Sequence, residues 1–251
     1  MRIAVVIPSR LSATRLPQKP LADIQGTPMI VWVWRQAQKA IGIDELVVAT
    51  DHEDIANVVK FHGGKVVMTR PDHQSGSDRV AEAAEKLGVD AAINVQGDEP
   101  FVHPQDISDI ANCLRQPACE MATLVHPIQN FEEFQNPNIV KVVMKNNQEA
   151  LYFSRSPIPY DRHNTKNLEH LYRHIGIYGY NLKVLLQLSQ TPPHPLELRE
   201  SLEQLRALAN GVGIRIIFGK TTGRGIDTPD DLTWARKRVE TLGNAAFPNC
   251  R

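Results

Sequence analysis

Short apolar runs alternate with amphipathic segments along the first half of the chain. Four of these runs are predicted to be strands: Ile3–Ile7, Glu45–Thr50, Lys65–Met68 and Ala91–Val95. Because Ile3–Ile7 is continuously apolar, it suits a strand that is buried on both faces of a sheet. Apolar residues at helical spacing predict helices that begin at Pro28 and Ser77 and others around Ile55 and Ile107. This rhythm predicts an α/β fold with a mostly parallel, doubly wound sheet.

The second half has a mixed pattern, which predicts a smaller α/β insertion. A short polar turn between Ile139–Val143 and Ala150–Phe153 indicates a hairpin. In Tyr172–Tyr180, alternation places the three tyrosines, His174 and Gly176 on one face. The remaining predicted elements are one helix that carries Leu198, Leu202, Leu205 and Ala209, a strand over Ile214–Phe218 and a helix over Pro229–Thr241. Residues 244–251 have little periodicity and are predicted to form a loose tail.

Composition narrows the class of protein. Of the 251 residues, 42% are hydrophobic and 22% charged, which is ordinary for a chain with a buried core and excludes a disordered one. Lys plus Arg and Asp plus Glu both number 28, so the chain lacks the net positive charge that is typical of proteins that bind nucleic acid. The longest apolar run, Met29–Trp34, is far too short for membrane insertion. Three cysteines without metal-ligand spacing, Cys113, Cys119 and Cys250, favour a reduced, cytoplasmic compartment.

The loop after the first strand has the composition of a phosphate-binding site. Within residues 8–20 it carries Arg10, Arg15, Lys19 and three hydroxyl side chains, but no acid. Cations neutralise a triphosphate and donors fix its oxygens, so the loop suits a nucleotide at the carboxyl end of a strand. The glycine and lysine pattern of a P-loop is absent. A solvated basic loop is the alternative interpretation.

Two acidic residues lie in turns where a metal ion could bind. Asp98 follows the predicted strand Ala91–Val95 and a glycine, and Asp227 lies one position before the N-cap of the last helix. Mg²⁺ is commonly held by one or two carboxylates together with substrate phosphates. The alternative is that both are ordinary turn acids, which are frequent beside glycine and at helix starts.

Six stretches of the chain, taken in order, resemble the sugar-acid cytidylyltransferases, and among them the 3-deoxy-manno-octulosonate (Kdo) cytidylyltransferases. They are Ile7–Leu21, Asp72–Arg79, Ala150–Pro159, Tyr172–Tyr178, Glu203–Arg206 and Asp227–Leu232. Each stretch alone is weakly specific, whereas the ordered set, from about residue 3 to residue 240, is specific. One departure is Gln18, which stands where many relatives have glycine.

The resemblance implies a single domain over residues 1–243 with a nucleotidyltransferase fold similar to that of GT-A glycosyltransferases. Residues 1–130 and 210–243 would bind the nucleotide, and residues 131–209 would bind the acceptor and dimerise. It further implies a cytoplasmic homodimer that uses Mg²⁺, CTP and Kdo to make CMP-Kdo and pyrophosphate for lipopolysaccharide synthesis.

The resemblance also assigns roles to individual residues. The CTP site would comprise Arg10, Arg15, Lys19, Gln74, Ser75 and Asp98. Asp98 and Asp227 would hold Mg²⁺ and would be catalytic together with Arg10 and Lys19. The Kdo pocket would comprise Arg155, His174, Tyr178, Glu203 and Gln204. The guanidinium of Arg155 suits the Kdo carboxylate, because it can donate two hydrogen bonds to it.

Two other functions stay open at the level of sequence. One is a cytidylyltransferase for another acidic sugar, such as 8-amino-Kdo or a sialic acid, although residues 73–76 favour Kdo. The other is a silent nucleotide-binding regulator, which would be expected to lack Asp98 or Asp227. Both residues are present.

Overall fold

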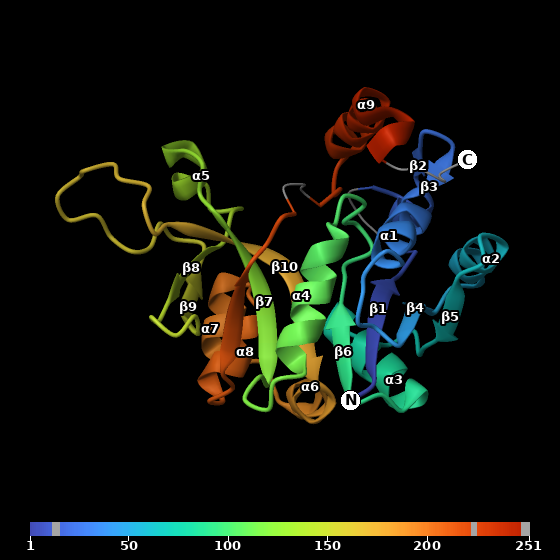
Figure 1. Ribbon diagram of the computed structural model, residues 1–251, viewed down its shortest axis with the longest axis horizontal. Coiled ribbons are helices and arrows are strands. Elements are labelled where there is room, and N and C mark those ends of the chain that lie inside the picture. The colour runs from blue at the N-terminus through green and yellow to red at the C-terminus, as the bar shows by residue number, and fades with distance from the viewer. Residues whose placement is uncertain (12–15, 222–224, 247–251) are drawn as a thin grey trace.

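The computed structural model describes residues 1–11, 16–221 and 225–246, with side chains up to residue 241. Its centre is one large sheet (Figure 1). The strand order is β11 (Ile214–Phe218), β7 (Met121–Pro127), β10 (Tyr172–Asn181), β6 (Ala91–Asn94), β1 (Ile3–Ser9), β4 (Glu45–Thr50) and β5 (Lys65–Met68). The last four strands are mutually parallel, and β10 runs antiparallel to its neighbours β6 and β7. The predicted α/β fold with a mostly parallel sheet is therefore confirmed.

Helices cover both faces of this sheet, as a doubly wound fold requires. One face packs against α1 (Met29–Ala37), α2 (Glu53–Phe61) and α4 (Pro104–Leu114), and the other against α3 (Gly76–Leu87), α6 (Leu182–Gln190) and α8 (Gln204–Ala209). Strand β1 shows why its sequence is continuously apolar. Ile3, Val5 and Ile7 belong to one hydrophobic cluster, whereas Ala4 and Val6 belong to the other, and all five are fully buried.

The inserted segment joins the main sheet through β10. A hairpin of β8 (Lys141–Met144) and β9 (Ala150–Ser154) was predicted with slightly different bounds, and β8 pairs with the start of β10. A bulge in β10 between Ile175 and Tyr178 inserts two residues, so the predicted alternation is preserved. Its aromatic face is confirmed by ring contacts from Tyr178 to His174 and to Tyr180.

Three local predictions were wrong. The helix predicted through Leu198 to Ala209 is interrupted at Ser201, whose φ of 52° ends α7 (Pro195–Glu200) before α8 begins. Leu198 is accordingly 67% exposed rather than buried. The N-cap of α3 is Ser75 and not Ser77, because Ser75 and Asp78 form a reciprocal capping box. The final helix α9 (Pro229–Ala246) extends into the segment predicted to be a loose tail.

Several elements carried no recognised sequence signal. They are β7, α5 (Phe131–Gln135), α6, the short β2 (Asp23–Ile24) and β3 (Thr27–Pro28), and a 3₁₀ turn over Lys19–Leu21.

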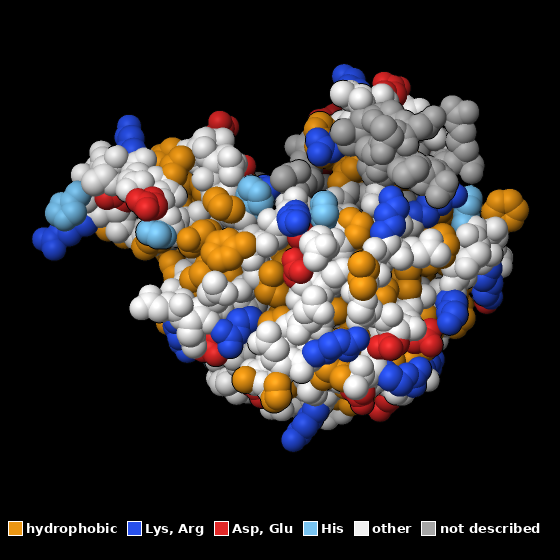
Figure 2. Space-filling model, in the orientation of Figure 1, with side chains coloured by type: hydrophobic (Ala, Val, Ile, Leu, Met, Phe, Trp, Pro, Cys, Tyr) orange, Lys and Arg blue, Asp and Glu red, His pale blue; other side chains and the backbone are white. Residues whose placement is uncertain are grey.

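The surface is hollowed between α5 and α9 (Figure 2), beyond the carboxyl ends of the parallel strands. Within the described residues, no helix has the length and apolar character needed to cross a membrane.

Gly179 is predicted to be required for the packing of α4 on β10. A Cβ atom at this position would overlap Ile110 and lie 2.9 Å from a methyl group of Leu114. We expect Gly179→Ala to cost about 1–3 kcal/mol of stability through overpacking. Gly176→Ala on the same strand is the control, since a Cβ there meets nothing within 4 Å. Equal melting temperatures for the two variants in thermal denaturation would contradict the prediction.

Candidate active site

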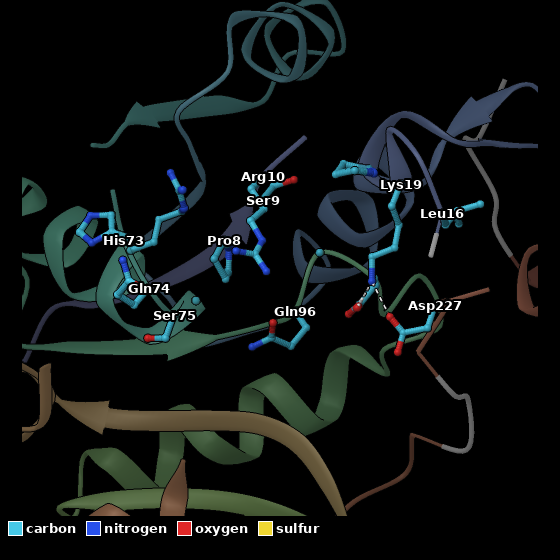
Figure 3. A pocket seen from close by; sticks show the side chains of 15 residues that line it. Pro8, Ser9, Arg10, Leu16, Lys19, His73, Gln74, Ser75, Gln96 and Asp227 are labelled. Atoms are coloured by element: carbon cyan, nitrogen blue, oxygen red, sulfur yellow. Dashed lines mark hydrogen bonds and ion pairs between the residues drawn. The ribbon is translucent and has the colours of Figure 1, made fainter. Parts of the chain in front are cut away.

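A cavity of about 360 Å³ opens at the carboxyl ends of β1 and β6. Parallel sheets bind ligands at this edge, because the loops that follow the strands converge there. In Figure 3, His73, Gln74 and Ser75 lie on one side of the cavity, Lys19 and Asp227 lie on the other, and Gln96 lies between them. The lining is completed by Pro8, Ser9, Arg10, Leu16, Pro20, Gly76, Arg79, Gly97 and Asp98.

Lys19 connects the two acidic residues of the site. Its Nζ lies 2.5 Å from Oδ2 of Asp98 and 2.8 Å from Oδ1 of Asp227. Burial lowers the pKa of the Lys19 ammonium, but the charges and hydrogen bonds of both carboxylates outweigh burial, so its pKa is raised. The ammonium therefore stays charged at neutral pH, and the two carboxylates converge on one cationic point.

Backbone contacts place the two carboxylates. A Cβ on Gly97 would lie 3.0 Å from the carbonyl oxygen of Pro8, so glycine permits the close approach that turns Asp98 into the cavity. On the other side, the amide of Ile226 donates to the carbonyl of Asp98 at 2.9 Å. Asp231 then accepts hydrogen bonds from the amides of Asp227 and Thr228. The start of α9 is thereby held against the end of β6.

Glu99 adds a third acidic group to this edge. Burial and the neighbouring charges of Asp98 and Asp227 raise the pKa of its carboxyl to about 8. Burial is the larger cause, and the charges of Asp98 and Asp227 add to it, while the nearby ammonium of Lys19 acts in the opposite direction.

The opposite wall is built by the start of α3 and the loop before it. Ser75 uses its hydroxyl oxygen to accept from the amide of Asp78, and the exposed Gln74 donates to the carbonyl of Asp72. The His73 ring is fixed by Glu82, which also accepts from the ammonium of Lys86 at 2.7 Å. This wall is therefore rich in polar atoms, and several of its side chains are held by hydrogen bonds.

The predicted nucleotide-site residues are brought together, as far as they are described. Lys19, Gln74, Ser75, Asp98 and the exposed Arg10 all line the same cavity. Asp227, predicted as a metal ligand, joins them. Arg15 lies outside the described residues.

The predicted acceptor residues lie beside this cavity, in separate groups. On β10, His174 and Tyr178 have ring centroids 5.2 Å apart, and Tyr178 is paired in register with Asn94 of β6. Thr123 donates its hydroxyl to the carbonyl of Ile177, so it accepts from Nε2 of His174 at 3.0 Å. Burial lowers the pKa of His174 to about 3, so its ring is neutral.

Glu203 and Gln204 line a second, much smaller cavity with Ser77 and Tyr180. Its volume of about 20 Å³ holds a water molecule and not a sugar. Gln204 is buried, and its Nε2 has no hydrogen-bond partner. A cavity of this size lets a water molecule pair with this donor, and contact with a sugar would require the pocket to widen.

Arg155 binds backbone carbonyls in this structure. Its Nε donates to Glu200 at 2.7 Å, and its other nitrogens donate to Pro137 at 3.0 Å and to Ser201 at 3.4 Å. It therefore holds the turn that leads to Glu203 and Gln204, a contact that the sequence did not indicate.

Sequence reasoning missed part of the cavity lining. Arg79 is 4% exposed and forms an ion pair with Asp51 at 3.3 Å. Arg79 ends the stretch Asp72–Arg79, one of the six that resemble the family, which could have pointed to it. Helical spacing did not indicate that its charge is buried. Gln96 reaches the cavity while donating to Asn94, and nothing in its sequence context distinguished it from a turn residue.

Comparison with known proteins gives one consistent result. A family described as cytidylyltransferase matches residues 4–216. The 3-deoxy-manno-octulosonate cytidylyltransferase of Parabacteroides distasonis is 46% identical over 243 residues, with 92% of this chain and 96% of the relative covered. The enzyme of the same name from Syntrophobacter fumaroxidans is 45% identical, with 92% and 94% covered. A solved CMP:2-keto-3-deoxy-manno-octonic acid synthetase complexed with CTP superposes with a TM-score of 0.92 at 43% identity, with 97% of this chain and all of that chain covered.

Glu82 is predicted to make stability depend on acidic pH. Burial would raise the pKa of its carboxyl, but hydrogen bonds from Lys86, His73 and the Arg70 amide lower it to about 2 from 4.5. Its contribution, on the order of 3 kcal/mol, is thus present above pH 4.5 and lost as the pH falls towards 2.

We therefore expect the advantage of wild type over Glu82→Gln to shrink between pH 5 and about pH 2.5 in chemical denaturation. Glu85→Gln, which alters an exposed carboxyl on the same helix, is the control. An advantage that stays constant over this range would contradict the assignment.

Proposed function

The chain belongs to the 3-deoxy-manno-octulosonate cytidylyltransferase family, and from this premise we propose that it transfers CMP from CTP to Kdo, with release of pyrophosphate. The observation that carries the proposal is the convergence of Asp98 and Asp227 on Lys19 in the wall of the cavity. This cavity offers cations for a triphosphate and two carboxylates at the edge where a parallel sheet binds nucleotides.

Asp98 and Asp227 fit a divalent cation. Oxygen ligands from one or two carboxylates, completed by substrate phosphates, are the usual protein environment of Mg²⁺. Among the described residues, no group of three or more His, Cys, Asp or Glu forms a metal cluster, so CTP would supply further ligands. Bound Mg²⁺ would supply charge neutralisation at the phosphates and would lower the pKa of a coordinated sugar hydroxyl.

The cationic side chains would bind and orient the triphosphate. Arg10 lies exposed at the cavity, where its guanidinium can donate two parallel hydrogen bonds to phosphate oxygens. Lys19 keeps its positive charge, because the adjacent carboxylates raise its pKa. When the Kdo hydroxyl attacks the α-phosphate, charge spreads over phosphate oxygens, and these fixed cations stabilise it.

The acceptor would be read by polar groups of the inserted segment. Neutral His174, the hydroxyl of Tyr178 and the amide of Gln204 offer donors and acceptors for sugar hydroxyls. The register of Tyr178 with Asn94, and the hydrogen bond from Gln96 to Asn94, connect this region to the nucleotide cavity. A site that hydrogen-bonds hydroxyls strongly rejects analogues that lack them.

The proposal also covers the pathway, the cellular compartment and the oligomeric state. The product would serve lipopolysaccharide synthesis in the cytoplasm, and the active form would be a homodimer. Exposed large apolar side chains on the inserted segment and the end of the sheet support a contact with a second copy. They are Leu151, Tyr160, Leu196, Leu198 and Phe218, with exposures from 40% to 87%.

The first test is release of pyrophosphate from CTP and Mg²⁺ with Kdo, 8-amino-Kdo and a sialic acid. We expect Asp98→Asn and Asp227→Asn each to lower turnover with Kdo by roughly 10²-fold or more at unchanged melting temperature. Asp230→Asn, an exposed acid in the first turn of α9, is the matched control. Absence of Kdo-dependent pyrophosphate would overturn the function, and near-normal turnover of either site variant would overturn its role.

Arg155→Lys is predicted to impair use of Kdo and to leave CTP binding almost unchanged. An ammonium can make neither the paired contact with a carboxylate nor the set of contacts to Glu200, Ser201 and Pro137. Acceptor kinetics beside calorimetric titration with CTP measure the two effects. Arg199→Lys, an exposed neighbour on α7, is the control. Equal loss for both ligands would contradict a role at the acceptor site.

A dimer contact at the exposed apolar residues is predicted to be weakened by Leu151→Glu or Leu198→Glu. Burying an unpaired carboxylate in an apolar contact is unfavourable, so light scattering should show a shift from dimer to monomer. Phe61→Glu, on the distant helix α2, is the control, because Phe61 is also a largely exposed apolar residue, at 86%. A wild-type protein that is monomeric throughout would refute the homodimer.

A further inference from the structure

Two cysteines with no part in the proposed chemistry lie in direct contact. Cys113 is in the last turn of α4, and Cys119 lies two residues before β7. Their Sγ atoms are 3.0 Å apart, whereas a disulfide bond measures about 2.05 Å. Both are free thiols, so a movement of about 1 Å would bring them to bonding distance.

We propose that Cys113 and Cys119 form a site of reversible oxidation, where a hydroperoxide converts the two thiols to an intramolecular disulfide. The intervening chain is already folded as a compact turn. The amide of Gln116 donates to the carbonyl of Cys113, and the amide of Cys119 donates to the carbonyl of Gln116, both at 3.0 Å. This turn holds the two cysteines close together, with their side chains in contact.

The local environment distinguishes the two sulfurs. A hydrogen bond from Cys119 lowers the pKa of the Cys113 thiol, and the same contact together with burial raises the pKa of Cys119. Burial raises the pKa of both thiols and the positive charge of Arg215 lowers both, so the contact between the two sulfurs is what separates them. The lower pKa favours Cys113 as the attacking thiolate. Both thiols are buried, with exposures of 7% for Cys113 and 6% for Cys119, so only a small oxidant can reach them.

The oxidation balances in two steps. The Cys113 sulfur attacks one oxygen of the hydroperoxide, the O–O bond breaks, and the thiol proton leaves with the alkoxide as an alcohol. The Cys119 sulfur then attacks the resulting sulfenic acid, the S–S bond forms, and hydroxide leaves with the second thiol proton as water. Two thiols and one hydroperoxide give one disulfide, one alcohol and one water.

The disulfide would stabilise the folded protein and would leave turnover nearly unchanged. Strand β7 is parallel to β6, because both run antiparallel to β10. The start of β7 and the end of α4 therefore lie at the end of the sheet where the parallel strands begin (Figure 1). The cavity lies at the other end, where β1 and β6 finish. A covalent link here ties α4 to the sheet and restricts the unfolded chain.

The experiment uses the full chain with Cys250→Ser, so that only the two contacting thiols remain. After treatment with hydrogen peroxide, the protein is alkylated in denaturant and weighed by mass spectrometry. We expect loss of two hydrogen atoms, protection of both cysteines from alkylation, and full reversal by dithiothreitol. The melting temperature should rise by a few degrees, and turnover should stay within about twofold.

Adding Cys113→Ser or Cys119→Ser should abolish both the protection and the rise in melting temperature. Thiols that remain open to alkylation, or oxygen added to one cysteine without a link, would overturn the proposal. A lower melting temperature of the linked form would overturn it too, because the native geometry would then be strained. Failure of the proposed transferase function would leave these readouts unchanged, since none of the bond measurements depends on turnover.

Discussion

The arrangement of the cavity edge depends on one ammonium group held between two carboxylates. Lys19 reaches Asp98 across 79 positions of sequence and Asp227 across 208. All three groups are at least partly withdrawn from water, with side-chain exposures of 18%, 25% and 46%. Two carboxylates so close together repel each other unless a cation lies between them. Any arrangement of the loops that separates these three residues leaves negative charge uncompensated beside Glu99.

That constraint explains why the surrounding backbone is so closely tied. The Gly97 turn approaches the end of β1, Ile226 bonds to Asp98, and the cap of α9 orients Asp227. Each contact joins segments that are remote in sequence. A nucleotide would therefore meet a wall whose charges are already in position, so little reorganisation is needed when phosphate charge develops.

The inserted segment meets this wall through the sheet itself. Strand β10 lies between β6 and β7, so Tyr178, a predicted acceptor residue, pairs with β6, the strand that leads to Asp98. Its antiparallel direction places Tyr178 opposite Asn94, whose side chain accepts a hydrogen bond from Gln96 in the cavity wall. The inserted segment is thus part of the same sheet as the cavity wall, and Arg155 donates hydrogen bonds to the turn that follows α7.

The sequence by itself determined the buried strands of the first half and the edge at which to look for a site. A continuous apolar run such as Ile3–Ile7 is sufficient, because a strand covered on both faces has no polar position. Strand β11 was predicted with its observed bounds, whereas β7 was missed and the helix through Leu198 was misplaced. Only the tertiary structure decided that β10 enters the sheet between β6 and β7, and that Arg79 is a buried, paired charge. The resemblance had assigned Lys19, Asp98 and Asp227 to one site, and the tertiary structure showed that Lys19 contacts both carboxylates directly. The physical reason is the distance in sequence over which each interaction acts. Periodicity within a segment reports which of its sides is buried. The element that covers this side is set by strand order and by contacts between residues far apart in the sequence.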